Sequence, residues 1–334
     1  MISFSPYKIT FMFSLLSGSL LTISSSSWFS AWVGLELNLM SFIPLIASKE
    51  NQLPSEASLK YFLIQALGSA IIILSSTLTF FLPSISLSFI SLALLLKLGA
   101  APFHFWLPQV MEGLNWTQIV ILMTIQKLGP MFLISYLSAE YYTHLVLFSS
   151  GIVSAVIGAL GGINQTSLRK IMAYSSINHM SWMLFAMLIN ETSWMIYFFM
   201  YALISASVAF YFSSNQAYFF SHLINSSQGP LSKIISMTNL YSLGGLPPFS
   251  GFVPKWIIIQ EMILASFYFS LLILLLSSLV TLYFYIRLSL TSISISFTQM
   301  KWNTSFKPLS IRLSPLFSFI NLFGLFVPSA LLII

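Results

Sequence analysis

Cysteine and aspartate are both missing from this 334-residue chain, and charged residues of any kind make up only 6% of it. Without cysteine the chain has no disulfide, thiolate zinc site, iron–sulfur cluster or cysteine nucleophile of its own. Any redox chemistry must therefore take place on partner chains. Without aspartate, the acidic residues are a few glutamates, so the position of each one is informative.

The scarcity of charge also indicates the class of protein. A soluble domain of this size needs roughly a quarter of its residues charged, whereas 57% of this chain is hydrophobic and its mean hydropathy is +0.91. The sequence therefore predicts an integral membrane protein in contact with lipids. The basic residues stand singly or in pairs between apolar runs, which excludes the basic patch of a nucleic acid partner.

Apolar windows of about 20 residues, long enough for a helix to cross a bilayer, follow one another along the whole chain. They predict an all-α fold of about eleven transmembrane helices, forming a single domain over residues 1–334. The windows cover residues 8–25, 28–47, 59–82, 85–107, 116–137, 144–163, 170–190, 194–213, 234–260, 264–288 and 315–334. No link is long enough to fold into a nucleotide-binding domain, and no glycine-rich phosphate loop or metal-spaced histidine cluster occurs.

The basic residues predict how the spans are oriented, because inner loops of membrane proteins are enriched in lysine and arginine. With eleven spans, the links on one side carry Lys8, Lys49, Lys60, Arg169, Lys170, Lys233, Arg287, Lys301, Lys307 and Arg312. The links on the other side carry Glu140, His144, Glu191 and Glu261. This asymmetry predicts an N-terminus on the inner side. Glu56 and Lys60, four residues apart near span three, are interpreted as a simple surface pair.

Four charged residues lie inside predicted spans: Glu36, Lys97, Lys127 and Lys255. Each would cost about 2.5 to 3.5 kcal/mol at a lipid-exposed helix centre, so we expect all four to face the helix bundle. One interpretation is that they form buried ion pairs that fix helix packing. The other is a proton relay, because three lysines outnumber the one glutamate. Burial without an acidic partner lowers the pKa of a lysine, so that it can exchange a proton near neutral pH.

Two histidines are further candidates for the relay. His104 lies seven residues after Lys97, and His179 lies in the middle of a predicted span. Imidazole titrates near physiological pH and could pass protons. Each histidine could equally be a neutral ring bonded to a backbone carbonyl.

Glycine and proline accompany the buried lysines. Lys97 is followed by Gly99 and Pro102, and Lys255 is preceded by "GGLPPFSGFVP". Proline removes a helical hydrogen bond, so we expect broken helices in spans four and nine. These spans are five apart, and an offset of five reverses direction across the bilayer. The spacing therefore suggests inverted five-helix repeats, an arrangement typical of ion-translocating folds.

Several segments resemble one known family. They are "WVGLELNLMSFIPLI", "EASLKYFLIQA", "KLGAAPFHFWLP", "QKLGP", "NQTSLRKIMAYSSINHMSW", "SLGGLPPFSGFVPKW" and "LYFYIRL". In this order they are similar to the family of subunit 2 of mitochondrial NADH:ubiquinone oxidoreductase, the antiporter-like membrane subunits of respiratory complex I. On the family pattern, Glu36, Lys97, Lys127 and Lys255 match charged residues of a central proton-conducting axis. His104 and His179 match polar positions near that axis.

The resemblance also implies a function and a location. It implies a proton-translocating subunit of an NADH:ubiquinone reductase, in contact with other membrane-arm subunits of complex I, including neighbouring antiporter-like subunits. It implies a multi-pass protein of the mitochondrial inner membrane with the N-terminus and basic links on the matrix side. No cofactor is expected in this chain, since NADH, FMN, iron–sulfur clusters and ubiquinone are implied on partner subunits. The residues alone leave two alternatives open, a stand-alone cation/proton antiporter and a structural scaffold without proton transfer of its own.

Overall fold

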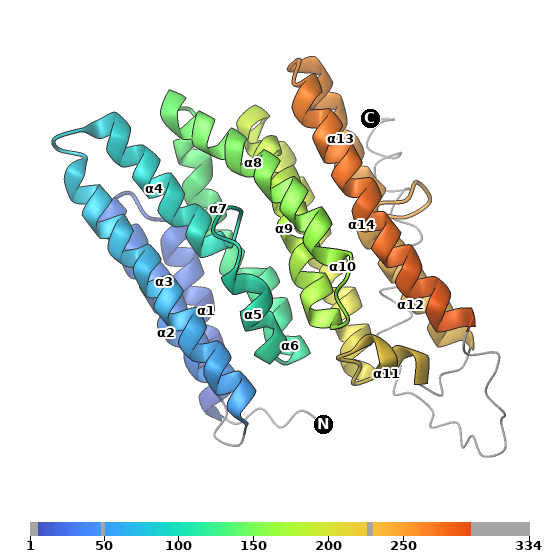
Figure 1. The fold of residues 1–334 in the computed structure, drawn as a ribbon. Helices are drawn as coiled ribbons and strands as arrows, with labels where there is room; N and C mark the ends of the chain where they lie inside the picture. The colour runs from blue at the N-terminus through green and yellow to red at the C-terminus, as the bar shows by residue number, and fades with distance from the viewer. Residues whose placement is uncertain (1–5, 48–50, 226–229, 295–334) are drawn as a thin grey trace, which may run out of the picture. The chain divides into compact units, whose positions relative to one another are not determined.

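The computed structural model describes residues 6–47, 51–225 and 230–294, and the regular elements in these ranges are α-helices joined by short links (Figure 1). The predicted window at 315–334 lies outside them. The only β feature in the described ranges is an isolated bridge between Ser167 and Phe219. The chain divides into two compact units, residues 1–154 and 155–334.

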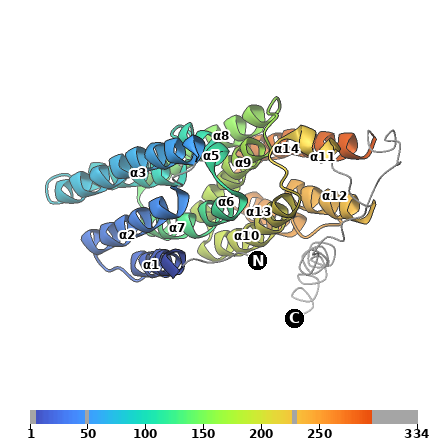
Figure 2. The same ribbon diagram turned by 90° about the horizontal axis from the view of Figure 1, so that it is seen from below.

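The first unit consists of closely packed helices of very different lengths. They are α1 (Pro6–Ile23), α2 (Trp28–Ile46), α3 (Gln52–Leu78), α4 (Pro83–Leu98), α5 (Trp106–Gly113), α6 (Trp116–Met123), α7 (Ile125–Leu137) and the first part of α8 (Tyr141–Gly162). Helices α1, α2 and α3 pack in chain order, as Figure 2 shows from below. Helix α4 packs against α3 and α7, and α5 packs against α3.

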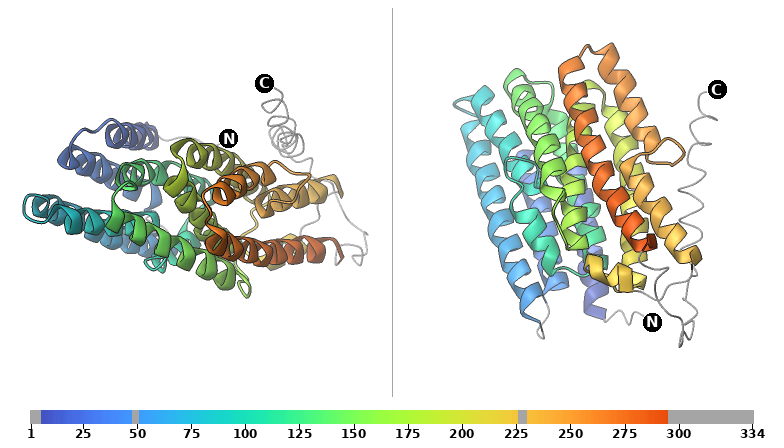
Figure 3. Two further views of the ribbon diagram at one scale, coloured as in Figure 1. Left: turned by 90° about the horizontal axis from the view of Figure 1, so that it is seen from above. Right: turned by 45° about the vertical axis from the view of Figure 1, so that its right-hand side comes forward.

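The second unit contains the rest of α8 and all later described helices. They are α9 (Leu168–Ile189), α10 (Glu191–Ser214), α11 (Phe220–Asn225), α12 (Pro230–Gly244), α13 (Phe252–Leu264) and α14 (Tyr268–Ser294). Helix α9 packs against α10, α13 and α14, and α12 packs against α10 and α14. The short α11 lies crosswise to the long helices of this unit, as the right-hand view of Figure 3 shows.

Six helical segments in the described ranges are long and apolar enough to cross a membrane. They are Trp28–Ile46, Gln52–Leu78, Trp116–Leu137, Tyr141–Gly162, Glu191–Ser214 and Tyr268–Thr291. Each coincides with one of the windows predicted from the sequence. The shorter Pro83–Leu98 is also apolar.

Local sequence explains where several helices begin and end. Ser27 caps α2, because its hydroxyl accepts the N–H of Ser30 at 3.3 Å. Pro83 occupies the first turn of α4, where its missing N–H does no harm. Inside the helices many serine hydroxyls donate to the carbonyl three residues earlier, as Ser41 does to Asn38 at 3.0 Å. A serine that bonds its own helix can lie in an apolar bundle without an unpaired hydroxyl.

Glycines allow α1 and α2 to approach each other closely. A Cβ atom on Gly18 would lie 2.8 Å from Oδ1 of Asn38, and one on Gly34 would lie 2.6 Å from Cγ2 of Thr22. Small residues at helix crossings let backbones pack together in membranes, where dispersion contacts replace the hydrophobic effect. This crossing places α2, which carries Glu36, firmly against its neighbour.

One interruption was not predicted from the sequence. Helices α6 and α7 meet at Thr124, whose φ of −114° and ψ of −81° are not helical. The sequence has proline six residues later, but Pro130 lies inside α7. The hydroxyl of Thr124 donates to the carbonyl of Val120 at 2.6 Å, so the residue closes the end of α6 with its own side chain. The interruption precedes Lys127 by less than one helical turn.

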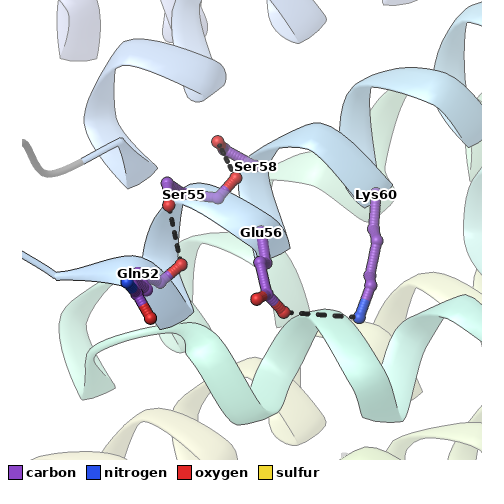
Figure 4. A network of polar contacts seen from close by, with 5 residues as sticks. All are labelled: Gln52, Ser55, Glu56, Ser58 and Lys60. Carbon is purple, nitrogen blue, oxygen red and sulfur yellow. Dashed lines mark hydrogen bonds and ion pairs between the residues drawn. The ribbon is translucent and has the colours of Figure 1, made fainter.

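The surface pair predicted near the start of span three is present. Nζ of Lys60 lies 3.9 Å from Oε2 of Glu56, and both side chains are at least half exposed (Figure 4). The pair lies in the first turns of α3, which begins at Gln52 rather than at residue 59. An exposed pair of this kind contributes little stability.

A buried asparagine connects two helices of the second unit. Oδ1 of Asn178 on α9 accepts the hydroxyl of Ser277 on α14 at 3.1 Å, and its Nδ2 donates to Oγ1 of Thr281 at 3.5 Å. Replacing Asn178 with leucine is expected to destabilise the protein by about 0.5 to 2 kcal/mol, the usual range for interhelical hydrogen bonds in membranes. The midpoint of thermal unfolding in detergent measures this loss. Ser278→Ala is the control, because the Ser278 hydroxyl donates to the carbonyl of Leu275 in its own helix at 2.8 Å. An equal loss in both variants would contradict the prediction.

Candidate functional site

Lys97 lies in the last turn of α4, and two glycines determine its place. Gly99 ends the helix with a φ of +72°, a conformation that suits glycine. Gly68 on α3 leaves room for the lysine stem, since a Cβ there would lie 3.0 Å from Cγ of Lys97. The lysine side chain is 6% exposed. It is therefore inside the helix bundle, as the cost of a lipid-exposed charge predicts.

The carbonyl groups at the end of α4 are bonded by side chains. Nε2 of Gln65 donates to the carbonyl of Lys97 at 3.1 Å, and Nε1 of Trp106 donates to that of Leu96 at 3.0 Å. The carbonyl of Leu96 also accepts the N–H of Gly99 at 3.2 Å. Carbonyls at a helix end have few intrahelical donors, and at membrane depth no bulk water can satisfy them. The two side-chain contacts stabilise the end of the helix beside Lys97.

Lys97 and Lys127 line one small cavity. Lys127 lies on α7 and is 2% exposed. The cavity measures about 10 Å³, which is room for about one water molecule. Its polar lining consists of Tyr61, Gln65, Lys97, Trp106, Gln126 and Lys127. Two of the three buried lysines singled out from the sequence therefore face a common space.

The polar residues of α3 in this cavity were not predicted to belong to the site. Tyr61 and Gln65 are both buried, and with Gly68 they repeat at the spacing of one helix face. That spacing was a usable signal in the sequence. It was missed because tyrosine and glutamine carry no charge and so do not stand out in an apolar span.

Glu36 and His104 lie in the same unit as the two lysines. Glu36 on α2 is only partly buried, and its carboxylate acts electrostatically on the ammonium group of Lys97. His104 is buried in the segment between α4 and α5, and its Nδ1 lies 3.2 Å from the carbonyl oxygen of Pro102. This is the contact expected of a neutral histidine ring bonded to a backbone carbonyl, which the sequence left as the alternative to a relay group.

The second unit holds a separate cluster around His179. Nδ1 of His179 on α9 lies 2.8 Å from the hydroxyl of Tyr197 on α10, and the imidazole lies 4.9 Å from the ring of Tyr201. These three residues line a second cavity of about 10 Å³, together with Ser242 and Pro254. A phenol bonded to an imidazole is a pair that can exchange a proton.

Lys255 lies near the N-terminal end of α13, and its ammonium group reaches back to α12. Nζ of Lys255 donates to the carbonyl of Gly244 at 2.8 Å and lies 5.9 Å from the ring centre of Trp182. Gly245 leaves room for it: its φ is +76°, and a Cβ there would lie 2.9 Å from Nζ of Lys255. The lysine is thus bound to the end of the helix that precedes it.

The two units share a local arrangement. In each, a helix ends at a glycine of positive φ, and a buried lysine lies beside that helix end. The C-terminal end of a helix carries partial negative charge, so it favours an ammonium group nearby. The first unit gathers Glu36, Lys97 and Lys127, and the second holds His179 and Lys255. In the part of the chain that the structure describes, no group of three histidine or acidic side chains could hold a metal ion.

These observations define a class, a multi-pass helical membrane protein with titratable side chains inside its helix bundle. The chain belongs to the NADH:quinone oxidoreductase/Mrp antiporter transmembrane family, whose family model matches residues 25–84 and 76–281.

Two relatives share one name. The NADH-ubiquinone oxidoreductase chain 2 of Anopheles gambiae is 46% identical over 97% of this chain and 97% of the relative. The protein of that name from Aedes aegypti is 44% identical over 95% of each chain. These identities are high enough to support the family assignment over nearly the whole sequence.

Two solved structures have a similar fold. A chain of respiratory complex I from Thermus thermophilus with bound aureothin has a TM-score of 0.84 at 24% identity, covering 98% of this chain and 81% of that one. A chain of the Mrp complex from Dietzia sp. DQ12-45-1b has a TM-score of 0.76 at 17% identity, covering 83% and 59%. At these identities the likeness concerns the fold.

Proposed function

We propose that the chain is a proton-translocating subunit in the membrane arm of respiratory complex I, and thus part of a proton-translocating NADH:ubiquinone reductase. The observation that carries this proposal is the burial of Lys97 and Lys127 around one cavity, with Glu36 in electrostatic reach of Lys97. The family match and the two relatives named NADH-ubiquinone oxidoreductase chain 2 support it.

In this proposal each of the titratable residues singled out from the sequence has a role in moving protons. Lys97 is the central carrier, and its proton affinity responds to the approach of Glu36, because a nearby carboxylate favours the charged amine. Lys127 and Lys255 are further carriers. His104 and His179 are secondary relay groups. The NADH, FMN, iron–sulfur clusters and ubiquinone of the reaction belong to partner subunits, as do the redox steps.

The proposal extends to the fold. The helix pairs α4/α5 and α12/α13 are two broken transmembrane helices, the fourth and ninth of about eleven spans. Residues 1–154 and 155–334 belong to one antiporter-like domain, which is supported by a family match that runs continuously across their boundary. The two broken helices take corresponding places in inverted five-helix repeats.

The proposed location follows from the same family. The protein is a multi-pass component of the mitochondrial inner membrane, with the N-terminus and basic links on the matrix side. Its partners are other membrane-arm subunits, including neighbouring antiporter-like subunits, and membrane lipids.

The two carriers other than Lys97 provide a test. Lys127→Met and Lys255→Met are each expected to lower the number of protons pumped per NADH oxidised, because methionine fills similar space but cannot bind a proton. The assembled complex in liposomes, with proton uptake and NADH oxidation recorded together, gives this ratio. Exposed Lys60, changed to methionine, is the control. Normal ratios in both buried variants would favour a structural scaffold.

A second measurement distinguishes the proposed function from that of a stand-alone cation/proton antiporter. The purified chain alone, reconstituted in liposomes with a sodium or potassium gradient, is expected to catalyse no cation/proton exchange. Exchange by the isolated chain would instead favour an antiporter that acts without redox partners.

A further inference from the structure

The cavity between Lys97 and Lys127 contains a hydrogen-bonded pair from two helices. The hydroxyl of Tyr61 on α3 donates to Oε1 of Gln126 on α7 at 3.2 Å. Both residues line the cavity together with the two lysines. Gln126 directly precedes Lys127 on α7, so the pair joins α3 to the helix that carries one of the two lysines.

Aromatic neighbours hold Tyr61 in this position. Its ring lies 5.2 Å from that of Phe42 in an edge-to-face contact and 5.9 Å from that of Trp106. The side chain is 2% exposed. A ring packed in this way has little freedom to turn its hydroxyl elsewhere, so the hydroxyl oxygen has a fixed place at the cavity wall.

The amide of Gln126 has an unused donor. Its Nε2 is buried and has no hydrogen-bond partner among the residues that the structure describes. A buried donor without a partner is unfavourable, and a water molecule commonly provides the missing acceptor. The cavity has room for about one water molecule, and a water there would lie in the space that both lysines line.

We propose that Tyr61 and Gln126 position one water molecule between Lys97 and Lys127 and that this water carries the proton from one amine to the other. Gln126 donates to the water through Nε2, and the hydroxyl oxygen of Tyr61, whose proton is engaged by Gln126, accepts from it. The two side chains are positioning residues, since neither gains nor loses a proton overall. The inference rests on the proposed function, because it describes a step between two of its carriers.

The transfer is balanced in charge and atoms. One N–H bond of the protonated lysine breaks as an O–H bond forms on the water. A second O–H bond of the water breaks as an N–H bond forms on the neutral lysine. The water is regenerated, and one positive charge has moved from one amine to the other. The same water can carry a proton in either direction, so the direction depends on the relative proton affinities of the two lysines.

Tyr61→Phe is the sharpest test, because it removes one oxygen atom and leaves the packed ring in place. The assembled complex in liposomes is expected to oxidise NADH with coupled proton uptake about fivefold to tenfold more slowly, the kinetic equivalent of one lost hydrogen bond. The rate ratio between H₂O and D₂O is expected to rise, because proton transfer becomes slower relative to the other steps. A purely structural role would not change this ratio.

Gln126→Met is the second variant, which removes the amide and keeps most of the volume. Tyr241→Phe is the matched control. Its hydroxyl also joins two helices, lying 2.9 Å from Oγ of Ser289, but Tyr241 does not line either cavity described above. We expect the control to keep the wild-type rate and isotope ratio. Rate and isotope effects in Tyr61→Phe or Gln126→Met, with a normal control, support the proposal.

The contrary outcomes are distinct. Normal rates and isotope ratios in both variants would overturn the inference while leaving the proposed function intact, provided that Lys97→Met, measured alongside, fails to pump. Normal pumping by Lys97→Met would overturn both. Failure of both variants to assemble, with normal assembly of Tyr241→Phe, would show that the pair only holds helices together and would also overturn the inference.

Discussion

Replacing Lys97 with methionine is expected to abolish proton pumping by this subunit while the complex still assembles. Methionine fills similar space within the bundle but has no amine, so the proposed central carrier is lost and Glu36 loses a cationic neighbour. Removing a relay residue blocks every transfer that passes through it, so this effect is the largest expected for any single side chain. The number of protons pumped per NADH oxidised, measured on the assembled complex in liposomes, checks the result.

Lys97→Arg distinguishes a proton carrier from a fixed charge. Arginine keeps the positive charge beside Glu36 but does not release its proton under physiological conditions. If Lys97 carries protons, the arginine variant fails to pump like the methionine variant. If Lys97 only pairs with Glu36 to hold helices together, arginine restores pumping. A normal proton-to-electron ratio in Lys97→Met itself would remove the lysine from the mechanism altogether.

Gly251→Ala is expected to be the most disruptive of the small substitutions. Gly251 precedes α13, and its φ of −69° suits any residue, so space alone decides the outcome. A Cβ atom there would overlap the carbonyl oxygen of Ser242 on α12. That oxygen belongs to the backbone and cannot rotate away. Relief therefore requires α12 and α13 to separate, which moves Lys255 away from the carbonyl of Gly244.

Overpacking of a dense interior costs about 1 to 3 kcal/mol, and a backbone clash lies at the upper end of this range. We expect little or no assembled complex, measured by its yield on native gels. Gly244→Ala is the matched control, because the nearest atom to its added Cβ lies at 3.6 Å, an ordinary contact. Equal yields for the two variants would mean that the helix junction at Gly251 is not close-packed.

The two lysines at helix ends differ in how the neighbouring carbonyls are bonded. At the end of α4, Gln65 and Trp106 provide donors that do not change with protonation. At the end of α12, the donor to Gly244 is the ammonium group of Lys255 itself. The charge on Lys255 is therefore coupled to the end of α12 more directly than the charge on Lys97 is coupled to α4.

The sequence by itself determined the class of the protein and the positions of six of its predicted spans. Hydropathy over a window of about 20 residues is a local property, and the cost of a charge in lipid is large enough to assign Lys97, Lys127 and Lys255 to the interior. The prediction that these lysines are buried is confirmed, and the six clear spans fall where the windows predicted them. The prolines near Lys97 and Lys255 predicted breaks in these two spans, and in the structure α4 ends just before Gly99 and α12 ends at Gly244.

Only the tertiary structure decided which side chains meet. Tyr61 bonds Gln126 across 65 positions of the chain, and Gln65 bonds the carbonyl of Lys97 across 32. Such contacts depend on how α3, α4 and α7 pack against one another. The periodicity of a single span does not predict this packing. The interruption at Thr124, six residues before the proline that the sequence offered, was decided in the same way. Local chemistry placed the charges in the bundle, and helix packing placed Lys97 and Lys127 around one cavity.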